Sequence, residues 1–306
     1  MTINEWLLQF QIPVRLTFFM LFFTILAVWE TADPWRLWMY PRFVRWVRHL
    51  GLTTLSKIFI KLLFPMLAVG IAIQVEKQGL GLLHQRPLHP ALAIIIGVIA
   101  LDFVIYVQHR ILHNLTWLWR VHRVHHIDRQ VDVSTGIRFH PIEEIYTMGF
   151  KIIGIGFFGV NPLAALIFEV IYNGVSLFTH VNVSMSQKME EFLQQFIVTP
   201  GMHRIHHSDI HSEMNSNFSF GLNIWDKLFG TYVKVSQTGE RKLSLGVETF
   251  RDPKYQEFEN MLWIPFNLKR LRVIVPKLRK TKKSFIQATM IPIPEKGKKK
   301  KSVSPS

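Results

Sequence analysis

Eight of the fourteen histidines fall into three short clusters. The first, HRILH, holds His109 and His113, and the two later clusters share the pattern HRxHH. Spacings of three and four residues place side chains on one face of a helix, and neutral imidazole is the commonest metal ligand among side chains. In an HxxHH box the adjacent histidine points about 100° away around the helix axis, so one box can serve two ions. The clusters predict a two-metal site; the later two contain His122, His125 and His126, and His203, His206 and His207.

The residues around these histidines narrow the expected chemistry. No acid lies inside the boxes, which disfavours a two-zinc hydrolase with bridging carboxylates, and the absence of cysteine removes thiolate zinc sites and Cys-bound iron–sulfur clusters. All-imidazole ligation suits iron, zinc, copper or nickel. Beside a membrane, we expect such a site to activate dioxygen against an unreactive C–H bond of a lipid. We assign no role to the isolated His49, His84 and His89, and we interpret His211 as a neighbour of the last box.

Apolar segments long enough to cross a membrane must position these histidines. Hydrophobic residues make up 49% of the chain, and segments 14–30, 58–75 and 90–108 are close to the roughly 20 residues that a span requires. The apolar region 147–179 is interrupted by GVNP, which predicts a helical hairpin. The alternative is one long kinked helix, with His180 on the opposite side from the boxes. The expected fold is an all-α integral membrane bundle, with about four spanning segments or hairpin arms and a histidine-rich catalytic cap.

The distribution of basic residues predicts the orientation. Loop 31–51 carries four arginines against Asp33, whereas loop 76–89 carries only Lys77 and Arg86 against Glu76. The positive-inside rule then places the first loop, and the histidine boxes with it, on the cytoplasmic face of a bacterial inner membrane or the endoplasmic reticulum. The chain also lacks a basic stretch ahead of its first apolar segment, so we interpret that segment as a retained helix rather than a cleaved signal peptide.

The net charge of +15 comes mostly from the C-terminal end of the chain. Residues 269–306 hold 13 Lys and Arg against one acid, Glu295. This segment fits an anionic lipid surface and a solvated disordered tail equally well, and it contains no nucleic-acid-binding motif. We therefore expect three parts: N-terminal membrane helices over 1–89, a catalytic domain over 90–265, and a basic, disordered tail over 266–306.

The histidine-containing stretches resemble a known family. Residues 102–126, RFHPIE (138–143), FTHVNV (178–183) and 199–232 are similar to the fatty acid hydroxylase/sterol desaturase superfamily, and the resemblance covers about residues 90–265. Its members are integral membrane, non-haem di-iron oxygenases that act on lipids. The resemblance therefore implies two Fe ions as cofactor and O2 as cosubstrate. It also implies ligand roles for the eight box histidines together with His140 and His180.

Acids and amides near the boxes are candidates for orienting the imidazoles, because a metal-bound histidine usually donates its other N–H to an acceptor. Helix capping or surface solvation is an equally good interpretation of each. We expect no catalytic residue beyond the metal ligands. The orienting candidates are Asp102, Glu143, Asn182, Asp209, Asn217 and Asp226.

Electrons must reach such a centre from outside. The sequence has no dinucleotide-binding fingerprint, no cysteine and no appended haem domain, so we expect no bound flavin, haem or Fe–S cluster. A separate ferredoxin-, cytochrome- or reductase-type donor is expected. The predicted function is O2-dependent hydroxylation or desaturation of a lipid. The alternatives are a non-catalytic membrane metal-binding protein, such as a sensor or storage protein, and a transporter, which is disfavoured because the boxes follow the spans.

Overall fold

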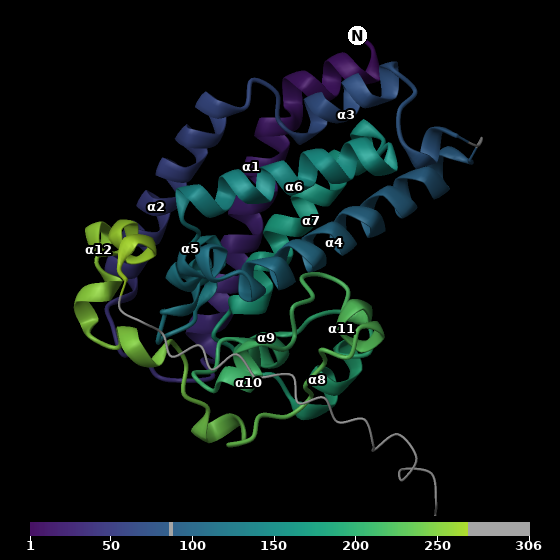
Figure 1. Cartoon of the computed structure of the whole chain (residues 1–306). Helices are drawn as coiled ribbons and strands as arrows, with labels where there is room; N and C mark the ends of the chain where they lie inside the picture. The colour runs from purple at the N-terminus through teal and green to yellow at the C-terminus, as the bar shows by residue number, and fades with distance from the viewer. Residues whose placement is uncertain (86–87, 269–306) are drawn as a thin grey trace, which may run out of the picture. The chain divides into compact units, whose positions relative to one another are not determined.

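Long apolar helices dominate the first 180 residues of the computed structural model, which describes residues 1–85 and 88–268 (Figure 1). Arg86 and the basic segment 269–306 lie outside the described residues, and so do the predictions made for them. The division of the chain at residues 89 and 265 also stays a prediction. The long helices are α1 (Ile3–Ala32), α2 (Arg42–Leu63), α3 (Ala68–Lys77), α4 (Pro90–Asn114), α6 (Pro141–Phe158) and α7 (Pro162–His180).

Among the described residues, four helical segments are long and apolar enough to cross a membrane, as predicted. They are α1, the segment Arg42–His84, α4 and α7. Within the described ranges the chain forms no strand, only isolated β-bridges, so the all-α prediction is confirmed. The predicted span 58–75 is not one helix. It breaks between α2 and α3 at residues 64–67, where Pro65 cannot donate the backbone hydrogen bond that would continue the helix.

The apolar region 147–179 forms the predicted pair of helices, and the alternative of one kinked helix is wrong. Helix α6 ends at Gly159, which adopts the left-handed conformation with φ of 70°. Asn161 then caps α7 through a hydrogen bond from the Leu163 N–H, and Pro162 takes the first helical position. The start of α6 and the end of α7 lie at the same end of the bundle, since Glu143 and His180 both contact box histidines.

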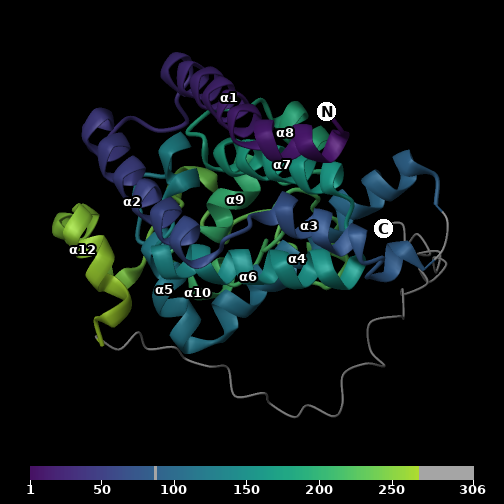
Figure 2. The ribbon, with the colours of Figure 1, turned by 90° about the horizontal axis from the view of Figure 1, so that it is seen from above.

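Small residues let α4 approach its two neighbours closely. A Cβ at Gly154 of α6 would lie 2.8 Å from a methyl group of Val104, and one at Gly97 of α4 would lie 3.1 Å from the Cβ of Ala164. Small side chains are the usual means of close helix packing in membranes. The main apolar core lies where α3 and α4 pack against α6 and α7, and Leu7 of α1 joins it (Figures 1 and 2).

Apart from η1 (Leu82–His84), which packs near Gly159 where α6 ends, the shorter helices gather at the histidine end of the long ones (Figure 1). The loop after α1 also lies there, because Trp35 N–H donates to the Asn182 carbonyl and Met39 N–H donates to Gln130. Arg45 at the start of α2 forms ion pairs with Asp128 and Asp132. The short helices are η1 (Leu82–His84), α5 (Thr116–His126), η2 (Val133–Ile137), α8 (Gln187–Leu193), α9 (Pro200–His206), α10 (His211–Met214), α11 (Ile224–Leu228), η3 (Glu240–Lys242), η4 (Glu248–Phe250), η5 (Pro253–Gln256), α12 (Phe258–Trp263) and η6 (Ile264–Phe266).

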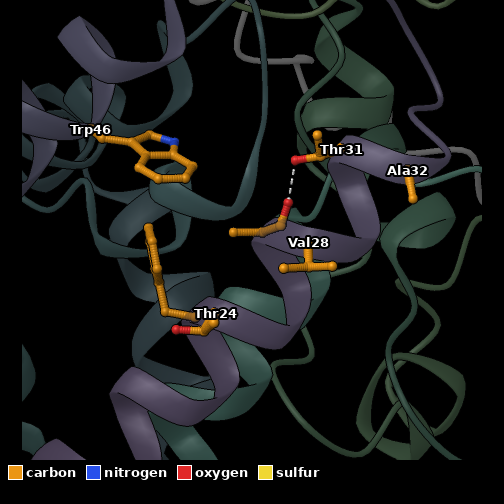
Figure 3. A pocket seen from close by; sticks show the side chains of 7 residues that line it. Thr24, Val28, Thr31, Ala32 and Trp46 are labelled. Atoms are coloured by element: carbon orange, nitrogen blue, oxygen red, sulfur yellow. Dashed lines mark hydrogen bonds between the residues drawn. The ribbon is translucent and has the colours of Figure 1, made fainter.

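A groove of about 510 Å³ lies between α1 and α2, away from the histidines. Figure 3 shows Thr24, Val28, Thr31 and Ala32 along α1 and Trp46 of α2 across from them. Thr31 donates to the Ala27 carbonyl of its own helix. Both walls belong to candidate membrane spans, and no histidine lines the groove.

Candidate metal centre

The structure gathers nine histidines into two adjacent groups. Within each group, one nitrogen of every ring lies within 4.8 Å of the others. Eight are box histidines, and the ninth is His180 at the end of α7. Group A contains His109, His113, His122, His126 and His206; group B contains His125, His180, His203 and His207.

Helical spacing explains how the boxes divide between the two groups. His122 and His126 are one turn apart on α5 and join group A, while His125 points elsewhere around the same helix and joins group B. The last box divides in the same way, since His206 belongs to group A and its neighbour His207 to group B. Thr199 caps α9 and Pro200 occupies its first position, which fixes where this helix begins.

The distances between ring nitrogens match those expected around a metal ion. The Nε2 atoms of His109 and His122 are 3.1 Å apart, and those of His180 and His203 are 2.9 Å apart. Metal–imidazole bonds of about 2.0–2.1 Å, set at right angles, separate the nitrogens by about 3.0 Å. Lone pairs that close repel one another unless a proton or a cation lies between them.

Backbone carbonyls fix the ring tautomers at three of these positions. Nδ1 of His109 donates to the Phe218 carbonyl, Nδ1 of His206 to the Ser216 carbonyl, and Nδ1 of His180 to the Ser176 carbonyl. A carbonyl oxygen only accepts, so each of these rings carries its proton on Nδ1 and presents a bare Nε2 lone pair to its group.

Burial keeps the remaining box histidines neutral. It lowers the pKa of His122 to about 3. Burial, reinforced by the neighbouring imidazoles, also lowers the pKa of His125, His203 and His207 well below the ordinary range. Several ring nitrogens are buried without a hydrogen-bond partner among the described residues, including Nε2 of His206 and both nitrogens of His113. Buried polar atoms without partners are costly, and a metal ion in each group would bind one nitrogen of each ring.

Sequence comparison agrees with this geometry. Residues 94–231, which include all nine histidines, match the family described as fatty acid hydroxylase. No solved structure matches the chain.

Three curated relatives are similar to part of this chain. An ornithine lipid hydroxylase of Rhizobium tropici is 33% identical over 143 residues, 46% of this chain and 42% of the relative. Human alkylglycerol monooxygenase is 27% identical over 180 residues, 55% of this chain and 37% of the relative. Human cholesterol 25-hydroxylase is 27% identical over 140 residues, 45% of this chain and 50% of the relative. The chain thus spans half or less of the length of these relatives.

His140 lies apart from both histidine groups. Its Nδ1 accepts from the Ile142 N–H and so caps α6, while Nε2 contacts the Leu262 carbonyl at 3.3 Å. Both ring nitrogens are therefore already used. A lone histidine ahead of a proline is equally compatible with helix capping and with ligation, so its sequence context does not indicate which applies.

Among the six orienting candidates, only Glu143 touches a ligand histidine directly. Its Oε1 lies 2.6 Å from Nδ1 of His122. Asp226 acts one step away: it accepts from the Phe218 and Ser219 N–H groups, beside the carbonyl that holds His109. Asn217, with φ of 50°, lies between the two carbonyls that orient His206 and His109, and its amide bonds the Met202 and Val233 carbonyls.

The other three candidates bind segments of the chain around the site. Asp102 accepts from the N–H groups of Gly221 and Leu222 and from Trp225 Nε1. Asn182 holds the backbone of Arg36, and Asp209 pairs with Arg251. Sequence reasoning missed the backbone carbonyls of Ser176, Ser216 and Phe218, because a carbonyl carries no side-chain signal.

A narrow cavity borders both histidine groups. It is about 20 Å³, and its wall includes His109, His122, His125, His180 and His203. The remaining wall is apolar along α4 and at Phe139 and Phe220, with polar side chains on α4, α6 and α7. This is where a substrate could reach both groups.

Proposed function

We propose that this chain is a lipid hydroxylase in which each histidine group holds one iron, with O2 as cosubstrate. One observation carries the proposal: nine neutral histidines, eight of them buried and His113 half-buried, form two adjacent groups whose ring nitrogens are spaced as metal ligands. The family match and the names of the relatives support the same chemistry. The proposed ligands are the nine grouped histidines, without His140.

The protein's own residues prepare this site. The carbonyls of Ser176, Ser216 and Phe218 orient three imidazoles, and Glu143 orients a fourth. Burial excludes water and keeps the rings unprotonated. Two irons bound here would supply the activation of dioxygen needed to oxidise a lipid C–H bond.

Hydroxylation is a better proposal than desaturation, because the relatives are named as hydroxylases and a monooxygenase. Their names include an ornithine lipid, an alkylglycerol and cholesterol, so we propose a membrane lipid as the substrate class. Electrons would come from a separate donor protein, since the chain has no cysteine with which to bind an iron–sulfur cluster. We further propose that the histidine end faces the cytoplasm, on the basis of the arginines in the first loop.

Oxygen uptake by purified, iron-loaded protein tests the proposal against a non-catalytic metal-binding role. With a chemical reductant and a lipid extract from the host membrane, uptake should exceed that of His206→Ala, and lipid species heavier by one oxygen should form. Two bound irons with no lipid-dependent uptake would instead support a storage or sensor protein.

A further inference from the structure

Helix α6 carries a stripe of polar side chains on an otherwise apolar segment. Glu143, Thr147 and Lys151 follow one another at intervals of four residues, and all three are buried. That spacing stacks them on one face of the helix. Burying polar groups is costly unless they are bonded, so a stripe of this kind calls for partners.

Glu143 and Thr147 of the stripe line the cavity beside the histidines. Not all polar atoms of this cavity wall have hydrogen-bond partners. Gln108 of α4 donates to Thr147 Oγ1 at 3.1 Å across the cavity wall. The Gln108 amide oxygen and the Tyr172 hydroxyl, which share this wall, take part in no hydrogen bond with the residues that the structure describes. Glu143 is 2% exposed, and its Oε2 likewise has no partner in the described chain.

Lys151, at the other end of the stripe, forms an ion pair and holds the Tyr172 ring in place. Lys151 Nζ lies 2.7 Å from Glu169, whose other oxygen lies 2.7 Å from Arg15. The same ammonium lies 4.0 Å from the centroid of the Tyr172 ring, which stacks on Phe220 at 4.4 Å. The ring is therefore fixed between a cation and an aromatic face, and its hydroxyl is presented from a rigid base.

We infer that Gln108 and Tyr172 bind a hydrogen-bonding group of the lipid substrate, next to the carbon that is oxidised. This inference rests on the proposed function, because only that function makes the bound lipid a substrate. The Gln108 oxygen accepts and the Tyr172 hydroxyl donates, so the pair is complementary to a group that does both, namely a hydroxyl or an amide. Because these residues and five ligand histidines line one cavity, the oxidised carbon lies close to that group rather than far along an acyl chain.

The size of the cavity favours a hydroxyl over an amide. At about 20 Å³ it has room for about one water-sized group, which a hydroxyl matches and which an amide or a methylene chain exceeds. The rest of the lipid must then enter by displacing side chains along the apolar wall. The competing interpretation is that Gln108 and Tyr172 hold a water molecule and have no role in recognition. An experiment must distinguish this water from a bound group of the substrate.

Equilibrium binding of three tritiated probes to purified protein in detergent makes this separation. The probes are 1-hexadecanol, which donates and accepts, its methyl ether, which only accepts, and hexadecane, which does neither. The preference for the alcohol over hexadecane is compared between the unchanged protein, Tyr172→Phe and Gln108→Leu. Since each probe partitions into detergent equally for all variants, changes in the preference report the site. Tyr146→Phe is the matched control, because Tyr146 is on α6 but makes an edge-on contact with Trp117 outside the cavity.

We expect the order alcohol, ether, hexadecane, and a loss of about tenfold in the preference for the alcohol in each cavity variant. The control should keep the full preference. Equal binding of the three probes, no binding of any probe, or an unchanged preference in Tyr172→Phe would overturn the inference and leave a water molecule as the occupant. The measurement needs no turnover, so absent oxygen uptake with intact discrimination would refute the proposed hydroxylase and leave the recognition site standing.

Discussion

At the scale of single residues, what separates the two histidine groups is the direction in which adjacent rings point. His206 and His207 are neighbours in sequence, yet they belong to groups A and B. The spacing of the boxes was enough to predict this sharing, because it follows from helix geometry alone. His140 joins neither group for an equally local reason, because its Nδ1 is occupied in capping α6.

Removing one ring from each group should empty the groups separately. We expect His206→Ala to lose the metal of group A and His207→Ala that of group B, each retaining about half of the bound metal, as measured by elemental analysis per chain. His211→Ala is the control, because His211 is exposed on α10 and belongs to neither group. Loss of all metal in both variants would mean that the groups do not bind independently, and retention in both would refute the ligand assignment.

The buried histidines also predict how the metal-free protein responds to acid. Burial lowers the pKa of His122 from 6.5 to about 3, so between these values the unfolded chain takes up a proton that the folded chain does not. Stability is therefore full above pH 6.5 and falls as the pH drops towards 3. Thermal unfolding of chelator-treated protein should begin at lower temperature at pH 5 than at pH 7.5. A flat profile would show that the rings are more accessible to protons than the structure indicates.

At the scale of elements, the sequence predicts helices better than it predicts their joints. The apolar runs located α1, α4 and α7, and GVNP located the turn before α7, because a glycine, a capping asparagine and a proline each act locally. The break between α2 and α3 was missed, since a proline inside an apolar run is compatible with either a kink or an interruption. What joins the elements at the histidine end is a buried ion network that no local pattern reveals.

Arg45 is the centre of that network, so its removal should be costly. Its guanidinium donates to both Asp128 oxygens and to Asp132, and all three side chains are buried. Burial alone would raise the pKa of Asp128, but Arg45 and Arg138 hold it well below its usual range. Arg45→Met leaves the buried Asp132 carboxylate without its ion-pair partner and leaves Asp128 with Arg138 alone. It should reduce the free energy of unfolding by about 3–5 kcal/mol, as measured by denaturant unfolding in detergent.

Another ion pair of α2 provides the control. Lys57 pairs with Glu144 at 2.7 Å, but its side chain is 53% exposed, so Lys57→Met should cost at most about 1 kcal/mol. Similar losses in the two variants would show that the Arg45 network is no more important than a surface pair.

At the scale of the whole molecule, the first loop, the start of α6 and the end of α7 all lie at one end of the bundle. Their common position could be predicted because charge, hairpin geometry and histidine spacing were independent signals that agreed. The cavity and its unpaired polar groups could not, because they depend on how α4, α6 and α7 pack against one another.

The orientation of this end can be measured directly, because the chain has no cysteine of its own. Lys188→Cys places a thiol in exposed α8 beyond His180, and Lys77→Cys places one at the exposed end of α3. An impermeant maleimide should label Lys77→Cys in intact cells and Lys188→Cys only after permeabilisation. The opposite pattern would place the histidines on the outer face.

Growth of cells expressing this protein under ¹⁸O2, followed by mass spectrometry of their lipids, tests the central claim most directly. We expect a lipid alcohol that carries one ¹⁸O atom. This product should be absent from cells expressing His206→Ala, and it should be unlabelled when the cells grow under ¹⁶O2 in H2¹⁸O. A protein-dependent product whose oxygen comes from water, a product that has only lost two hydrogens, or no product at all would contradict a dioxygen-dependent hydroxylase.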